Sequence, residues 1–69
     1  MKVSARNALK AKVKKIITGS VNSEVILEIS PGIEVTSIIT NEAVKSLNIT
    51  EGADAYAVIK SSDVMVAVD

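Results

Sequence analysis

The sequence contains no cysteine, no histidine, no phenylalanine and no tryptophan. Without cysteine and histidine, a chain cannot form disulfides, thiolate zinc sites, catalytic thiols or imidazole general bases. The single aromatic ring is that of Tyr56, so the core must consist of small and branched aliphatic side chains, which each bury less area than a ring. A small domain without disulfides or metal usually gains stability by association of identical subunits. We therefore expect a homo-oligomer.

The sequence also has no long hydrophobic run. No stretch approaches the ~18 uninterrupted apolar residues of a membrane span, and the start of the chain carries Lys2 and Arg6 without the apolar region of a signal peptide. These absences predict a cytoplasmic protein with no membrane partner. Apolar residues make up 48% of the chain and charged residues 23%, which is a mixture typical of folded proteins. Because a chain of 69 residues has room for one core, we expect a single domain over residues 1–69.

Five segments have the apolar–polar alternation or the β-branched composition of strands. They are residues 3–13, 21–29, 33–39, 55–59 and 64–68. In the first segment the apolar side chains occupy odd positions until Ile16 and Ile17 break the phase. This break predicts a bulge near Lys14 and Lys15, which would bend the strand.

The pattern changes between the second and fourth of these segments. Pro31 and Gly32 predict a turn, because proline lacks a backbone N–H and glycine tolerates positive φ. The neighbouring Ile38 and Ile39 predict a more deeply buried end for the third strand. The segment Thr40-Asn41-Glu42 then predicts the cap and first turn of one short helix.

The order of these elements indicates a small barrel. Five short strands cannot bury both faces of an open sheet in so short a chain, whereas a curled sheet satisfies its own edges. The predicted fold class is all-β, an OB-type five-stranded Greek-key barrel with one short helix between strands 3 and 4. An SH3-like barrel has the same number of strands but would not favour a helix at that point.

Catalysis has no support in the sequence. None of the eight acidic residues falls in a recognisable nucleophile or metal-ligand constellation with the basic residues or with Tyr56. Neither GxGxxG nor GxxxxGK[ST] occurs, and the three glycines are scattered. We therefore expect no enzyme activity, no catalytic residues, no metal site and no catalytic cofactor.

Positive charge is concentrated in the first part of the chain, where six basic residues precede the first acid, Glu24. They are Lys2, Arg6, Lys10, Lys12, Lys14 and Lys15. A nucleic-acid-binding OB module that uses this basic N-terminal strand is the alternative function, and a solvated strand face explains the same charges. OB barrels that bind single strands stack bases on exposed rings, which are missing here unless Tyr56 supplies one instead of filling the core. Nucleic acid is therefore not the expected partner.

Small oxyanions fit the residue types. A tetrahedral dianion requires short convergent donors, namely hydroxyls, backbone N–H groups and one or two cations, with no opposing carboxylate. The segment Ser4-Ala5-Arg6-Asn7 supplies such donors, and so does Thr40 at the helix start together with Lys60-Ser61-Ser62. A polar subunit contact, an N-cap and a turn are the alternative explanations of these segments.

The chain resembles the molbindin family, whose members are small molybdate- and tungstate-binding proteins. The resemblance covers the whole chain and is carried by Ser4-Ala5-Arg6-Asn7 with Leu9 to Val13, by Val35 to Thr40 and by Ala57 to Met65. It implies an OB-type subunit assembled as a trimer of dimers, a homohexamer that binds oxyanions at subunit interfaces without performing chemistry on them. The implied function is intracellular binding and storage or buffering of molybdate or tungstate.

The resemblance also implies the residues of two sites. The principal interface pocket would comprise Ser4, Ala5 and Arg6 of one subunit and Thr40, Lys60 and Ser61 of another. A second oxyanion site, near the three-fold axis, would lie at the turn Gly19-Ser20-Val21. Under this hypothesis the two cations attract the dianion, and the size of the pocket separates molybdate or tungstate from sulfate.

Overall fold

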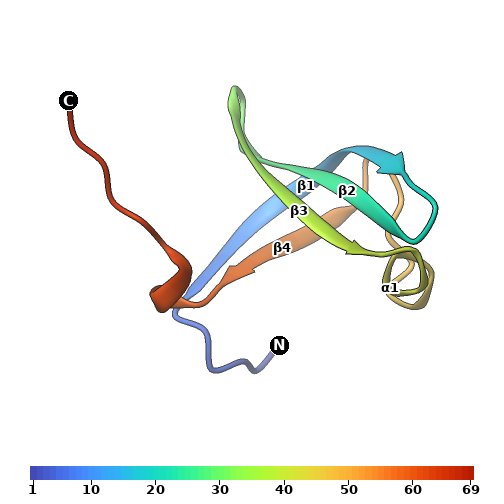
Figure 1. Cartoon of the computed structure of the whole chain (residues 1–69), viewed down its shortest axis with the longest axis horizontal. Helices are drawn as coiled ribbons and strands as arrows, with labels where there is room; N and C mark the ends of the chain where they lie inside the picture. Colours follow the sequence, from blue (N-terminus) through green and yellow to red (C-terminus); the bar gives the residue numbers. More distant parts are fainter.

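The computed structural model describes all 69 residues and contains four antiparallel strands, one short α-helix and one 3₁₀ turn (Figure 1). The elements are β1 (Asn7–Thr18), β2 (Asn22–Ser30), β3 (Ile33–Thr40), α1 (Asn41–Ser46), β4 (Asp54–Ile59) and η1 (Ser61–Asp63). The strand order in the sheet is β3-β2-β1-β4, which is the Greek-key order because β4 returns to pair with β1. The predicted all-β class, with one helix between the third and fourth strands, is confirmed. No helix has the length and apolar character needed to cross a membrane.

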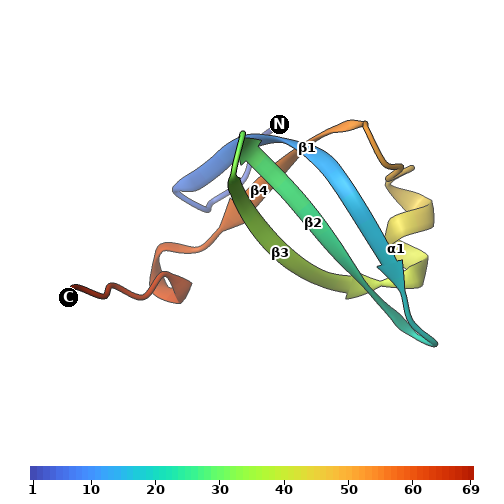
Figure 2. The ribbon, with the colours of Figure 1, turned by 90° about the horizontal axis from the view of Figure 1, so that it is seen from above.

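The predicted bulge in β1 is confirmed. Val13 pairs with Leu27 and Lys15 pairs with Ile26, so Lys14 is the extra residue. The bulge transfers Ile16 to the inward-facing set, opposite the buried Val25. An extra residue of this kind bends the strand and increases its twist, which curls the sheet around its core (Figure 2).

The loop before β4 is hydrogen-bonded to the bulge. The N–H of Val13 donates to Ala53 O at 2.9 Å, and the N–H of Gly52 donates to Val13 O at 2.7 Å. The N–H of Ile16 donates to the carboxylate Oε2 of Glu51 at 2.9 Å. The two backbone bonds of Val13 continue the β1–β4 contact beyond the last pair, Lys12 with Asp54, and together with the Glu51 bond they satisfy β1 backbone groups beside the bulge.

The core is thin. Only six of the 69 residues are buried, and five of them are apolar: Ala11, Val13, Val25, Leu27 and Ala57. They come from the inward faces of β1, β2 and β4, which alternate as the sequence predicts. A core without a large side chain leaves much of the apolar surface of the chain to be covered in another way.

One local prediction about burial is wrong, and the position of Tyr56, which the sequence left open, is decided. Ile38 is 66% exposed, because the alternation of β3 continues to its end and places this side chain on the outer face of the sheet. Tyr56 is 50% exposed and does not fill the core, since its position in β4 pairs with Lys10 on the outer face.

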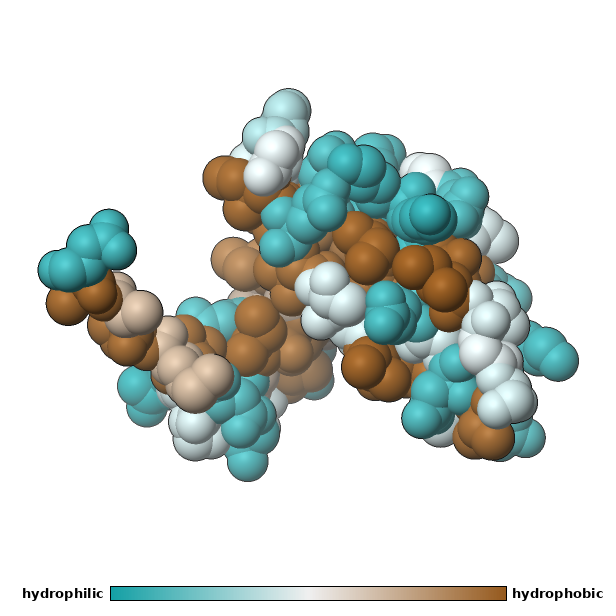
Figure 3. Space-filling view, turned by 45° about the horizontal axis from the view of Figure 1, so that its top comes forward, coloured by the Kyte–Doolittle hydropathy of each residue, from teal (hydrophilic) through white to brown (hydrophobic).

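The predicted fifth strand does not form. Residues 64–68 have no regular structure and extend away from the sheet after η1 (Figures 1 and 2). Their apolar side chains are uncovered, with Met65, Val66 and Val68 each at least 90% exposed, and Figure 3 shows them standing clear of the body. A strand requires a partner for its backbone groups, and no edge of the same chain reaches this tail.

Because the fifth strand is missing, the sheet is not closed into a barrel. Its two edge strands, β3 and β4, face each other across an open seam of about 280 Å³. Leu27 lines this seam together with Val35, Thr36 and Ser37 from β3 and residues 56–59 from β4. The seam is therefore mainly apolar and lies between two unpaired strand edges.

Candidate functional site

A hollow of about 270 Å³ lies where the N-terminal segment passes the end of β4. It is lined by Ser4, Ala5 and Arg6 from the N-terminal segment and by residues 60–62 after β4. The sheet brings these segments together because Asn7, at the start of β1, pairs with Ile59 at the end of β4. The side-chain amide of Asn7 also donates to Ile59 O at 3.3 Å. Residues on either side of this pair must therefore lie close together.

The hollow is rich in hydrogen-bond donors that nothing in the chain uses. Ser4, Ser61 and Ser62 contribute three hydroxyls, and none of these is hydrogen-bonded within the chain. In the 3₁₀ turn, Asp63 N–H donates to Lys60 O at 2.9 Å, whereas the N–H groups of Ser61 and Ser62 have no acceptor. The N–H groups of residues 4–6 are likewise free of hydrogen bonds within the chain. Such a set of donors can bind the oxygens of an anion.

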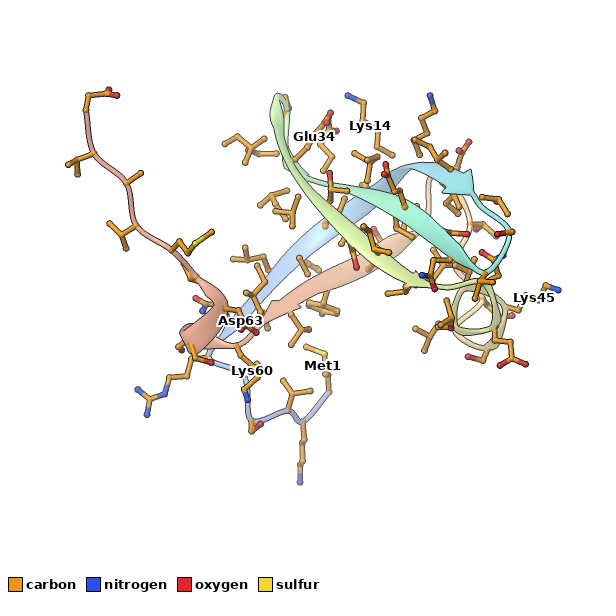
Figure 4. All side chains as sticks on the ribbon, in the orientation of Figure 1. Met1, Lys14, Glu34, Lys45, Lys60 and Asp63 are labelled. Atoms are coloured by element: carbon orange, nitrogen blue, oxygen red, sulfur yellow. The ribbon has the colours of Figure 1, made fainter.

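The charge of the hollow is positive. Arg6 and Lys60 both line it, and neither forms an ion pair within the chain. No carboxylate is among the lining residues. Asp63 lies in the adjacent turn and is the nearest acid along the chain (Figure 4). Two unpaired cations and no lining carboxylate are the electrostatic requirements for holding a dianion.

Two of the four lysines of β1, Lys12 and Lys14, form ion pairs with acids. Lys12 forms an ion pair with Asp54 at 2.7 Å, and this hydrogen bond holds the pKa of Asp54 below its ordinary value. Lys14 lies between Glu28 and Glu34, and the hydrogen bond from Lys14 to Glu34 raises the pKa of the lysine. Lys10 and Lys15 have no acid partner, so the basic N-terminal strand is partly neutralised and is not a continuous positive face. The structure therefore does not favour the nucleic-acid alternative.

Thr40 lies apart from the hollow. It is the N-cap of α1, and its Oγ1 accepts from Ala43 N–H at 3.1 Å. The helix stands at the opposite end of the sheet from η1 (Figures 1 and 2). Thr40 instead lies beside the turn of residues 19–21, since Asn41 N–H donates to Val21 O at 2.8 Å.

The predicted site residues therefore group differently from the expectation. The prediction assigned Ser4, Ala5 and Arg6 to one subunit and Lys60 and Ser61 to another, whereas the structure gathers all five around one hollow of a single chain. The five residues lie together because Asn7 pairs with Ile59, and the alternation of apolar and polar residues does not determine which strands pair.

Ser62 is a lining residue that the predicted site omitted. The sequence does carry a signal for it, because it continues the run of polar residues after Lys60. Its hydroxyl and its free N–H extend the donor set supplied by Ser61.

The hollow is open to solvent on one side. Apart from Ala5, all of its lining residues are exposed. An ion held by these residues would therefore face solvent unless another surface covered the hollow.

Comparisons with known proteins agree with this description. The TOBE domain family matches residues 3–66. The chain is 50% identical over 66 residues to molybdenum-pterin-binding protein 1 of Clostridium pasteurianum, which covers 96% of this chain and 97% of that protein. The solved structure of a molybdate-binding protein from Sporomusa ovata matches with a TM-score of 0.90 at 32% identity, over 99% of this chain and 100% of that chain.

A further solved structure is that of ModG with molybdate bound, described as a cytoplasmic molybdate-binding protein. It matches with a TM-score of 0.88 at 51% identity and covers 94% of this chain and 46% of the ModG chain. The likeness to these structures confirms the predicted OB-type fold class. Because the matches extend over nearly the whole chain, this protein belongs to the TOBE domain family and is of the molbindin type.

Proposed function

We propose that this protein binds molybdate or tungstate reversibly and serves as an intracellular store or buffer of the ion. The observation that carries the proposal is the hollow at the end of β4, which combines two unpaired cations with three free hydroxyls and no carboxylate. The names of the relatives support the choice of ligand, since they describe molybdenum-pterin and molybdate binding. The description of ModG as cytoplasmic supports the location.

The site would act by capture without chemistry. Arg6 presents a planar fork of N–H donors that suits two oxygens of one anion, and Lys60 adds a second positive charge. Ser4, Ser61 and the free N–H groups of the 3₁₀ turn would hold the remaining oxygens. Molybdate and tungstate share the charge and shape of sulfate but have longer bonds to oxygen, so the spacing of donors would provide the selectivity.

We also propose that the protein is a homo-oligomer, assembled as a trimer of dimers, in which each chain is one domain over residues 1–69. Three observations support association: only six buried residues, an apolar tail with no cover, and an apolar seam between two free strand edges. The tail of one copy has the extended backbone and apolar side chains that the seam of another copy would accept. Such an exchange would supply the missing fifth strand to each barrel.

Association would also complete the site. The hollow is open on one side, and Thr40 is exposed and distant from the hollow of its own chain. Its hydroxyl oxygen accepts from Ala43 N–H, which leaves the hydroxyl proton free to donate to an anion. Thr40 of a neighbouring subunit would close the hollow over Ser4, Arg6 and Lys60.

The second oxyanion site is proposed at the turn Gly19-Ser20-Val21. The N–H groups of Ser20 and Val21 have no acceptor in the chain, and the Ser20 hydroxyl is also unused. A turn that presents two backbone donors and a hydroxyl is suited to a shared anion near a symmetry axis.

Calorimetric titration with molybdate in excess sulfate tests the principal site. Wild-type protein is expected to release or absorb heat that persists in sulfate, and the double variant Arg6→Ala, Lys60→Ala is expected to lose it. The matched control is Lys10→Ala, Lys45→Ala, which removes two exposed positive charges outside the hollow and is expected to bind normally. Heat that disappears in sulfate, or that survives in the first double variant, contradicts the proposal.

A gel shift with a generic oligonucleotide tests the alternative function. Binding confined to low salt is expected, because the basic residues of β1 offer phosphate contacts alone. Binding that persists at physiological salt would instead favour a nucleic-acid module.

A further inference from the structure

Asn41 connects the start of α1 to the turn between β1 and β2 through two hydrogen bonds and to β2 through a third. Its side-chain Nδ2 donates to Gly19 O at 2.9 Å, and its backbone N–H donates to Val21 O at 2.8 Å. Its Oδ1 accepts from the hydroxyl of Ser23, a side chain that is 2% exposed. One residue therefore holds two carbonyl groups of the turn, those of Gly19 and Val21, and also accepts from a buried hydroxyl.

These bonds determine where the donors of the turn point. In a trans peptide the C=O and the following N–H point in opposite directions. Because Gly19 O is directed at Asn41, the N–H of Ser20 is directed away from α1, and it has no acceptor in the chain. The direction of this donor is thus set by the side-chain amide of Asn41.

The turn has little freedom to adopt another shape while this contact is present. Gly19 N–H donates to Asn22 O at 2.9 Å, and a Cβ at Gly19 would lie only 2.6 Å from the same oxygen. The turn is therefore closed by a backbone hydrogen bond, and the Asn41 amide fixes the direction of Gly19 O in addition. The figures show the turn beside α1 in both ribbon views (Figures 1 and 2).

We propose that Asn41 is a positioning residue for the second oxyanion site, because its side-chain amide orients Ser20 N–H toward the anion. This inference rests on the proposed second site at residues 19–21. Asn41 does not contact the ion itself. It acts through Gly19, whose carbonyl it holds.

A pair of variants separates positioning from stability. Asn41→Ala removes the bond to Gly19 O, whereas Ser23→Ala removes the other side-chain bond of Asn41 and leaves the bond to Gly19 O in place. The readout is the ¹⁵N amide shift of Ser20 as tungstate is added to the assembled protein. The amides of Ser4 and Ser61 report the principal site in the same titration, and thermal melting reports the stability of each variant.

In the wild type, Ser20 is expected to shift on addition of tungstate. In Asn41→Ala the tungstate concentration for half of that shift is expected to rise about fivefold, the effect of one net hydrogen bond. In Ser23→Ala it is expected to stay close to the wild-type value, and Ser4 and Ser61 are expected to respond normally in both variants.

Each other outcome has a distinct meaning. An unchanged Ser20 response in Asn41→Ala, or an equal loss in the two variants, overturns the role of Asn41 and leaves the proposed function intact. A wild-type protein in which Ser4 and Ser61 respond but Ser20 does not overturns both the second site and the role of Asn41. A wild-type protein in which none of the three responds contradicts the proposed function as well.

Discussion

The exposed tail offers a sharp test of how this chain is stabilised. Val66 is 90% exposed in the single chain, whereas Val13 is 1% exposed in the core. Replacing valine by alanine removes two methyl-sized groups, each of which contributes about 0.8 kcal/mol when buried. In an isolated chain, Val13→Ala would therefore cost about 2 kcal/mol once the cavity is included, and Val66→Ala would cost almost nothing.

Exchange of tails between subunits changes this expectation. A dimer that buries Val66 twice would lose about 3 kcal/mol in Val66→Ala, which corresponds to roughly hundredfold weaker association. Sedimentation velocity over a dilution series, combined with thermal melting at the same concentrations, measures both effects. We expect Val66→Ala to dissociate at a concentration where the wild type remains assembled.

The matched control is Ala67→Gly, which changes the neighbouring residue of the same tail with little loss of apolar area. It is expected to associate much as the wild type does. Unchanged association and melting in Val66→Ala, alongside a clear loss in Val13→Ala, would refute the docking of the tail. A wild-type protein that sediments as a monomer would refute it more simply.

Three further predictions concern the bulge, an ion pair and the turn. Glu51→Ala removes the acceptor of Ile16 N–H and is expected to cost about 1 kcal/mol, with faster hydrogen exchange at Ile16, whereas Glu51→Gln keeps an acceptor and should cost less. The hydrogen bond from Lys12 lowers the pKa of Asp54 below its ordinary value of 3.8. The stability contributed by this ion pair is therefore fully present above pH 3.8 and is lost as the pH falls through the lowered pKa of Asp54. In the wild type the urea midpoint should be lower well below pH 3.8 than at neutral pH, and Lys12→Met should reduce this difference. A difference as large as in the wild type would show that the Lys12–Asp54 pair does not cause the pH dependence. Gly19→Ala brings a Cβ within 2.6 Å of Asn22 O, so it should lower the free energy of unfolding in denaturant by about 1–3 kcal/mol. The same variant should bind tungstate more weakly at Ser20. A variant as stable as the wild type would show that the turn relaxes freely.

The strands and helix were predictable because their signals are local. The phase break at Ile16 and Ile17 indicated the bulge that the β1–β2 register shows. The sequence allowed either Thr40 or Asn41 as the helix cap, and the structure assigns the cap to Thr40. Alternation also identified the inward face of β1, where Ala11 and Val13 are buried.

The errors arose where neighbours, and not periodicity, decide burial. Ile38 is apolar and lies in a predicted strand, but its side chain is on an outer sheet face that nothing in the chain covers. The tail has the composition of a strand, yet a strand requires a partner edge, and no residue pattern states which chain supplies that edge.

Five of the six residues that line the hollow were among the predicted site residues, but their grouping in one chain was not predictable. Ser4, Arg6, Lys60 and Ser61 were identified by their chemistry and by the family resemblance. Their closeness within one chain depends on the pairing of Asn7 with Ile59, two residues separated by most of the sequence. Pairing over that separation has no local signature, so the structure was needed to show it.

The most direct test of the central claim is a crystal structure of the protein grown with tungstate. We predict strong tetrahedral density in the hollow at the end of β4, within hydrogen-bonding distance of Arg6, Lys60 and the serine hydroxyls, and enclosed by a neighbouring chain. Tungsten bound elsewhere, with water alone between Arg6 and Lys60, would contradict the account.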